Sequence, residues 1–206
     1  MRALPPRKYR SSEKRKATRE QNRAAIEAAA WEVFCRNGLD AANVRDIVDR
    51  SGVSPGTFYN YFRTKEAIFE VLAQNVLERI RAETRAGRAK ASTLDELLFL
   101  SYDSYFNVLA SIDGAMEFID RNQHHIRSQL YPSSAISGLT ADLAEDLRRF
   151  VPREVMSRRD RMLMSSVIIA AGAEAVFQAG RNPRMMKYLR EFLPRLLLKG
   201  LDGWRQ

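Results

Sequence analysis

The sequence predicts an all-α protein with a small N-terminal helical domain and a larger C-terminal helical domain. Apolar residues recur at helical spacing in nearly every periodic segment, and no segment shows the alternation of a half-buried strand. The stretch RAETRAGRAKAST (81–93) has almost no apolar residues and is the best candidate for a boundary. At 206 residues and 45% hydrophobic composition, the chain is large enough to bury a core.

The N-terminal domain is predicted to contain three short helices and the start of a fourth. The first begins near Glu20 with one apolar face and ends at Gly38, as helices often do at a glycine. Asn43 is placed to cap the second helix, and Ser54, followed by proline, caps the third. Thr64 then opens a fourth helix that links the two domains, over about 64–82.

The third helix, within SGVSPGTFYNYF (51–62), has an unusual composition. On a helical wheel Phe58 and Phe62 lie 40° apart and define a buried side. The opposite face offers a small residue, a hydroxyl, an amide and two phenols, from Gly56, Thr57, Tyr59, Asn60 and Tyr61. An uncharged set of donors and acceptors on a short helix after a tight turn fits the major groove of a DNA duplex.

Residues 26–72, IEAAAWEVFCRNGLDAANVRDIVDRSGVSPGTFYNYFRTKEAIFEVL, resemble the N-terminal domain of TetR-family (tetracycline-repressor-like) transcriptional regulators. The resemblance implies an all-helical homodimeric repressor that binds a palindromic operator and is released by a small, largely apolar effector. It also implies base or backbone contacts from Thr57, Tyr59 and Tyr61, and phosphate contacts from Lys65 and from Arg45. An alternative is a TetR-like architectural or cell-cycle DNA binder that has no small-molecule effector.

The formal charge of +9 is concentrated at the N-terminus, where residues 1–23 hold nine Lys or Arg and two Glu. Such an arm suits nucleic acid or an anionic membrane surface, or is a solvated tail. Beside a DNA-binding domain, an arm contact with DNA is favoured. The expected organisation is a flexible basic arm (1–19), a helix-turn-helix domain (20–66), and an effector-binding and dimerisation domain (67–206). The arm residues expected on DNA are Arg10, Lys14, Arg15, Lys16 and Arg19.

The C-terminal domain is predicted to contain helices near 94–109, 114–130, 136–150, 158–179 and 184–202, with Pro194 kinking or splitting the last. Small residues on the helix near 158–179 allow close approach of another helix, and the last helix carries an apolar stripe. The resemblance implies that these two helices form the dimer interface, through Ala170, Ala171, Gly172, Ala175, Leu189, Phe192, Leu193, Leu196 and Leu197. The alternative is that both stripes are intramolecular core.

Large, adaptable side chains in the middle helices suggest an effector pocket, although such stripes are more often ordinary core. The candidate lining residues are Tyr102, Tyr105, Phe106, Met116, Phe118, Met162, Glu174 and Phe177. Glu174 interrupts an apolar helix, so a buried carboxylate there needs an Arg, a partner subunit or a ligand. Arg121 and Arg127 are candidates for an anionic effector, with surface placement as the default.

Several other classes of function are disfavoured by the sequence. No catalytic constellation, phosphate-binding loop or metal-ligand spacing is recognisable, so neither an enzyme nor a cofactor is expected. His124 and His125 are adjacent and point 100° apart on a helix, which argues against a metal site. Cys35 is the only cysteine. No apolar run reaches about 18 residues, so the expected location is the cytoplasm, without a membrane.

Overall fold

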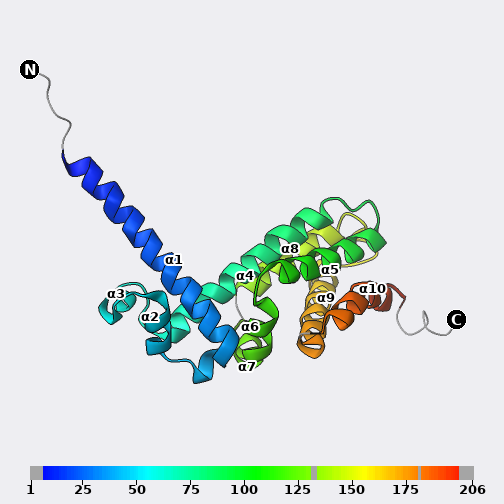
Figure 1. Cartoon of the computed structure of the whole chain (residues 1–206). Coiled ribbons are helices and arrows are strands. Elements are labelled where there is room, and N and C mark those ends of the chain that lie inside the picture. Colours follow the sequence, from blue (N-terminus) through cyan, green and yellow to red (C-terminus); the bar gives the residue numbers. More distant parts are fainter. Residues whose placement is uncertain (1–6, 131–133, 181, 200–206) are drawn as a thin grey trace, which may run out of the picture. The chain divides into compact units, whose positions relative to one another are not determined.

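A computed structural model describes residues 7–130, 134–180 and 182–199, and these ranges contain helices and no strand (Figure 1). The chain divides into two compact units between Leu72 and Ala73. The division falls inside a helix rather than in the stretch 81–93. Each unit has its own buried apolar core.

The first unit contains α1 (Arg7–Ala41), α2 (Val44–Ser51), α3 (Pro55–Tyr59) and the start of α4 (Lys65–Arg88). The aromatic rings of Phe34 and Phe69 meet edge to face at 5.5 Å between centroids, in a core that α1 and α4 share. Gly38 has φ 74°, so the α1 backbone departs from helical geometry at the predicted glycine before it ends at Ala41.

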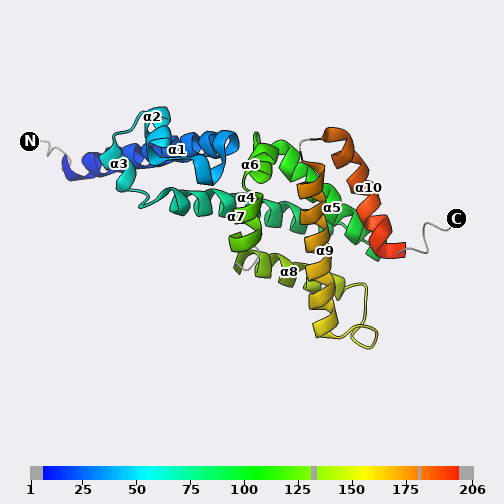
Figure 2. The same ribbon diagram turned by 90° about the horizontal axis from the view of Figure 1, so that it is seen from below.

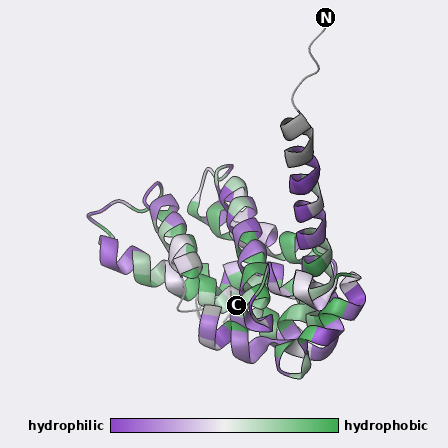
Figure 3. Ribbon diagram, turned by 90° about the vertical axis from the view of Figure 1, so that its left-hand side faces the viewer, coloured by the Kyte–Doolittle hydropathy of each residue, from purple (hydrophilic) through white to green (hydrophobic). Residues whose placement is uncertain are grey.

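Two predictions about the first unit are wrong in detail. The basic arm was expected to be flexible through residue 19, but α1 already begins at Arg7. Figure 3 shows hydrophilic residues on the turns of α1 that follow the grey part of this helix. Residues 1–6 and the side chain of Arg10 lie outside the described part of the chain. The third helix is also shorter than expected and ends at Tyr59.

The second unit continues α4 and adds α5 (Leu94–Ser111), α6 (Ala115–Arg121), α7 (Gln123–His125) and a π-helix (Ile126–Leu130). It ends with α8 (Ser134–Leu147), α9 (Arg158–Ala179) and α10 (Pro183–Lys199). Helix α9 packs against α8 and α10, and α10 packs against α5 (Figure 2). The core between them is built from fully buried side chains such as Leu97, Phe106, Leu143 and Val176.

The predicted boundary stretch 81–93 is mostly helix, because α4 continues to Arg88. Thr84, Gly87 and Arg88 of this stretch are buried in the second unit, although none of them has a large apolar side chain. The helix expected over 114–130 is broken at the buried Asn122 and ends in the π-helix. Pro194 lies inside one continuous α10 rather than splitting it, and residues 200–202 of the expected last helix lie outside the described residues.

Helix α9 is long and apolar enough, by length and composition, to cross a membrane. No run of this kind was expected from the sequence. Ile168, Val176 and Phe177 of this helix are nevertheless buried in the core of the second unit. The apolar composition is thus explained by packing between neighbouring helices, since a core helix passes the same test.

Candidate functional site

The turn between α2 and α3 is defined by local hydrogen bonds that the sequence predicts. The Asp46 amide donates to the Asn43 side chain at 2.9 Å and the Asn43 amide donates back to Asp46 at 3.1 Å, which completes a capping box. Gly52 ends α2 in the left-handed region with φ 71°, where a side chain would be strained. The Thr57 amide then donates to the Ser54 hydroxyl at 3.1 Å and starts α3.

Helix α3 separates a buried side from an exposed one, as the helical wheel predicts. Phe58 is fully buried and Phe62 is nearly so, which confirms them as core. Tyr59 is 56% exposed and rests its ring edge to face on Phe58, at 5.4 Å between centroids. Gly56 and Asn60 are exposed as well. These groups form a continuous stretch of accessible backbone, amide and phenol on a short helix.

The end of α3 differs from the ideal wheel. The Tyr61 amide donates to the Phe58 carbonyl at 2.9 Å, a tight bond that ends the helix in a turn. Tyr61 is therefore presented from this turn and is half-buried. The Thr57 hydroxyl lies 2.8 Å from that of Ser54, so it takes part in the cap at the start of α3. Contacts of Thr57 and Tyr61 with DNA stay predictions.

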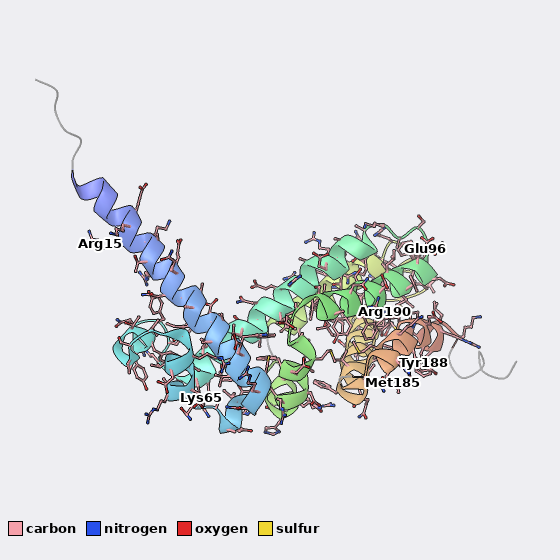
Figure 4. The ribbon with its side chains drawn as sticks, viewed as in Figure 1. Arg15, Lys65, Glu96, Met185, Tyr188 and Arg190 are labelled. Carbon is pink, nitrogen blue, oxygen red and sulfur yellow. The ribbon has the colours of Figure 1, made fainter. Side chains whose placement is uncertain are left out.

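Lys65 has a structural role that the sequence did not reveal. Its ammonium donates to the main-chain carbonyl oxygens of Leu39, Asp40 and Ala42, at 2.8, 3.0 and 2.8 Å. An ammonium group has three N–H donors, so these bonds use all of them. Lys65 (labelled in Figure 4) thus caps the end of α1, and its predicted phosphate contact would have to compete with these bonds.

The predicted basic contacts lie on exposed helical surface. Lys14, Arg15, Lys16 and Arg19 are exposed on α1, and Arg15 is labelled in Figure 4. The Arg45 side chain is 89% exposed, with Asp49 at 3.7 Å on the next turn of α2. The exposure of these cations leaves them accessible to a polyanion, and their contacts with DNA stay predictions.

The second unit contains an apolar cavity of about 140 Å³ that is partly open to the surface. Helices α4, α5, α6, α8 and α9 contribute its walls, together with Ile126 of the π-helix. Four of the predicted pocket residues line it, namely Tyr102, Tyr105, Phe118 and Phe177. Gly172 also lines it, and a Cβ there would come within 3.0 Å of the Tyr102 ring, so the glycine allows α9 to approach α5 closely.

The other predicted pocket residues are elsewhere. Phe106 and Met116 do not line this cavity but a separate surface cleft beside α10. The Phe106 ring is stacked on that of Tyr102 at 6.4 Å between centroids. Met162 does not line the cavity. Neither does Glu174, whose side chain is 46% exposed rather than buried. The spacing of apolar residues in a helix predicts which face is buried. It does not predict which residues of that face line a cavity.

Glu174 has an arginine partner at the surface. Its carboxylate lies 2.7 Å from Arg127, and the hydrogen bonds from Arg127 and then from Gln178 hold the pKa of Glu174 below its usual value. The Arg127 guanidinium also lies over the Phe177 ring at 4.1 Å from its centroid.

Within the described residues, no group of three His, Cys, Asp or Glu side chains could hold a metal ion.

The polar groups that line the cavity are mostly satisfied by the main chain. The Tyr102 hydroxyl donates to the Ile168 carbonyl at 2.7 Å, and burial raises the pKa of this phenol, which keeps it neutral. Ser101 and Thr84 donate to carbonyls of their own helices. Arg88 is the exception and was missed by sequence reasoning, because it lies in the stretch that was interpreted as a boundary.

The residues of the predicted dimer interface differ in their exposure, and the interface itself stays a prediction. Gly172, Ala175, Leu189 and Leu193 are buried within the single chain. The other predicted residues, Ala170, Ala171, Phe192, Leu196 and Leu197, are half-buried. The exposed large apolar residues of these two helices are instead Leu163, Met164 and Val167 on α9 and Met185 and Tyr188 on α10 (the last two labelled in Figure 4). We call these five residues the apolar face.

Comparison with known proteins identifies the first unit. Residues 26–72 match the family described as bacterial regulatory proteins, tetR family. The chain is 47% identical over 49 residues to the HTH-type transcriptional regulator YvdT of Bacillus subtilis, covering 24% of this chain and 25% of that protein. It is 28% identical over 135 residues to YdgC of the same organism, covering 66% of each. These curated relatives are thus matched over a quarter to just under two thirds of their lengths.

Solved structures share the fold of the whole chain. The fatty acid degradation regulator FadR from Bacillus halodurans is 24% identical, with a TM-score of 0.73 over 87% of this chain and 96% of that one. FadR from Bacillus subtilis in complex with stearoyl-CoA is 22% identical, with a TM-score of 0.68 over 86% and 98%. At this identity the likeness concerns the fold. The capped helix-turn-helix and the match over residues 26–72 show that this segment is a DNA-binding domain of the TetR type, and the solved structures show that the chain as a whole shares their all-helical fold.

Proposed function

We propose that the protein is a sequence-specific DNA-binding transcriptional regulator, most simply a homodimeric repressor of a palindromic operator that acts in the cytoplasm. The observation that carries the proposal is the surface of α3, where Tyr59, Gly56 and Asn60 are exposed on a helix held by Phe58 and by two caps. A rigidly supported helix with uncharged donors and acceptors can enter a major groove and read base edges.

Specificity in this design relies on few side chains. Pro55 and Gly56 lack groups that reach base edges, so direct readout falls to Tyr59 and Asn60, with Thr57 and Tyr61 at the margins. Phosphate contacts from Arg45 and from the helical basic segment of α1 would supply affinity without sequence information. DNA shape and deformability would then contribute to selectivity.

Two copies of the chain are needed to read a palindrome, because one α3 covers few base pairs. The heads of such dimers contact half-sites about 34–36 Å apart. Support for a dimer comes from the apolar face, whose large side chains are 40–57% exposed in a single chain. Exposed residues of this kind on two neighbouring helices mark an interaction surface.

The effector proposal rests on the cavity in the second unit. A ligand changes the affinity for DNA only by the difference between its own affinities for the free and the DNA-bound forms. The FadR of Bacillus subtilis, which has the same fold, was solved with stearoyl-CoA. In this chain the cavity is lined mainly by apolar side chains and measures about 140 Å³, which favours a smaller apolar ligand.

The deciding experiment is binding of the purified protein to a labelled fragment of its own upstream DNA, with excess random DNA and at several salt concentrations. Tyr59→Ala should weaken binding by about 1–3 kcal/mol, roughly 5- to 150-fold, as loss of a base contact does. Phe99→Ala, which removes a 45% exposed aromatic from the second unit, serves as the matched control and should bind as the unaltered protein does.

The salt dependence tests the basic segment separately. Replacing Lys16 and Arg19 together by alanine should reduce the magnitude of the salt slope by about 2 if each contacts a phosphate. Equal binding of the unaltered protein to random and upstream DNA would favour the architectural alternative. Absence of binding by a folded dimer would overturn the DNA-binding proposal.

A further inference from the structure

Arg88 contributes a buried donor without a protein acceptor to the wall of the cavity. The residue is only 3% exposed, and its Nε donates to Asp146 at 2.6 Å. Its Nη2 is buried and has no hydrogen-bond partner, and among the cavity-lining side chains that the structure describes it is the one polar group in this condition. A buried, unpaired donor costs about 1–3 kcal/mol, more when it is charged, so an acceptor at this point is strongly favoured.

The charges around Arg88 specify what kind of acceptor fits. Four guanidinium groups, from Arg81, Arg85, Arg88 and Arg149, surround the two carboxylates of Asp142 and Asp146. Arg149 also donates to the Ala91 carbonyl at 2.9 Å, which holds it at this end of the unit. The local excess of positive charge favours an anion over a neutral carbonyl, and charge-assisted bonds to arginine are stronger than neutral ones.

The rest of the cavity wall favours an apolar body for the ligand. The hydroxyl protons of Tyr102, Ser101 and Thr84 are already donated to main-chain carbonyls, so they offer no donor to a second polar group. The other lining residues are largely aliphatic or aromatic, including Leu109, Phe118, Ile168 and Val176. A ligand here is therefore recognised by one anionic end and by the burial of an apolar remainder.

The size of the cavity limits that remainder. An engineered cavity of about 150 Å³ in another protein holds benzene. The cavity here is about 140 Å³, so a ligand with on the order of ten non-hydrogen atoms fits. A long acyl chain such as that of stearoyl-CoA, found in a protein of the same fold, would need the cavity to expand.

We propose that the cavity binds a small aromatic or short aliphatic carboxylic acid, whose carboxylate accepts a hydrogen bond from Nη2 of Arg88. The proposal deepens the effector role and rests on it for its regulatory meaning, although binding itself can be tested without DNA. Arg88 selects the acid, and Asp146 positions the guanidinium through the bond to its Nε.

Isothermal titration with benzoate, phenylacetate and hexanoate, each compared with its amide, tests the ligand class on the unaltered protein. At least one acid should bind about tenfold or more tightly than its amide, the difference expected for a buried charge-assisted bond. Equal affinities for every acid and its amide, or absence of binding by all six probes to a folded protein, would overturn the proposal.

Three variants locate the site. Arg88→Met should weaken binding of the acid about tenfold or more and leave the amide within about twofold. Arg79→Met is the matched control, because it removes the same charge from an exposed position on the same helix that neither lines the cavity nor belongs to the cluster around Asp142 and Asp146, and should change affinity far less. If Arg88→Met does not fold, Ala173→Leu, which fills space at the lining and keeps Arg88, should abolish binding. Undiminished binding in a folded Ala173→Leu protein would place the acid elsewhere.

A DNA-binding assay with the same acids separates the two proposals. Release of upstream DNA by the acid, lost in Arg88→Met, supports both the site and its regulatory role. Binding of the acid with unchanged affinity for DNA leaves the carboxylate site standing and removes the effector role.

Discussion

The ammonium group of Lys65 donates a 2.8 Å hydrogen bond to the main-chain carbonyl of Leu39, so the first residue of α4 caps the end of α1. Two more bonds, to Asp40 and Ala42, complete the cap. A cation at a helix C-terminus interacts favourably with the helix dipole and with carbonyls that have no partner inside the helix. This contact joins residues 26 positions apart and connects the end of α1 to the start of α4, the helix that follows α3.

Lys65→Met is expected to lower the free energy of unfolding of the first unit by about 1–3 kcal/mol, since the cap bonds are charge-assisted and partly buried. Urea unfolding followed by hydrogen exchange of the last turn of α1 measures the effect. Lys90→Met, at an exposed lysine, is the control and should change stability little. If Lys65 also contacts a phosphate, the salt slope of DNA binding will fall by about 1. An unchanged slope would confine it to the cap.

Gly56→Ala separates a glycine needed for function from one needed for folding. A Cβ at Gly56 would meet no atom within 4 Å, so the substitution should stabilise α3, by up to about 1 kcal/mol. Affinity for upstream DNA should fall nonetheless, because the backbone could no longer approach the duplex as closely. Gly52→Ala is the contrasting variant, since its φ of 71° is strained for alanine and costs about 1–2 kcal/mol. Unchanged DNA affinity in Gly56→Ala would show that close approach is not required.

Val167→Glu should convert the proposed dimer into monomers. Val167 is 55% exposed on α9 and belongs to the apolar face, so the charge is tolerated in a single chain but would be buried without a partner in an interface. Sedimentation velocity measures the outcome. Val155→Glu, at a 76% exposed valine outside α9 and α10, should leave the dimer intact. A dimer that survives Val167→Glu would assign the interface to another surface.

The ion pair of Asp142 with Arg81 makes stability depend on pH. The 2.6 Å bond from Arg81 lowers the pKa of Asp142 below its value in the unfolded chain. The stabilisation is therefore fully present above the unfolded pKa, near 4, and is lost as the pH falls through the lower folded pKa. Because Arg81 is 45% exposed, the effect should be below about 1 kcal/mol. Urea unfolding from pH 7 to pH 3 should show a shallower decline for Asp142→Asn, and an equal decline would remove this contribution.

Much of the first unit can be predicted from the sequence, because its helix boundaries depend on local interactions. Asn43, Gly52 and Ser54 specify their caps through bonds that span three or four positions. Phe58 and Phe62 are assigned to the core by spacing alone, and the structure confirms them. The basic residues of α1 were recognised as well, but their helical conformation was not, since charge composition does not report backbone geometry.

The remaining features were decided by tertiary contacts between distant residues. Arg88 is buried because it meets Asp146, 58 positions later, and Lys65 caps a helix that ends 24 positions before it. Glu174 was expected inside and lies at the surface with Arg127. The sequence by itself determined the helices, their caps and the face that α3 exposes, because those follow from neighbours along the chain. Only the tertiary structure decided which apolar residues surround the cavity, which of them remain exposed on α9 and α10, and which arginine is buried at the cavity wall. Helical periodicity indicates that a face is buried and not what covers it.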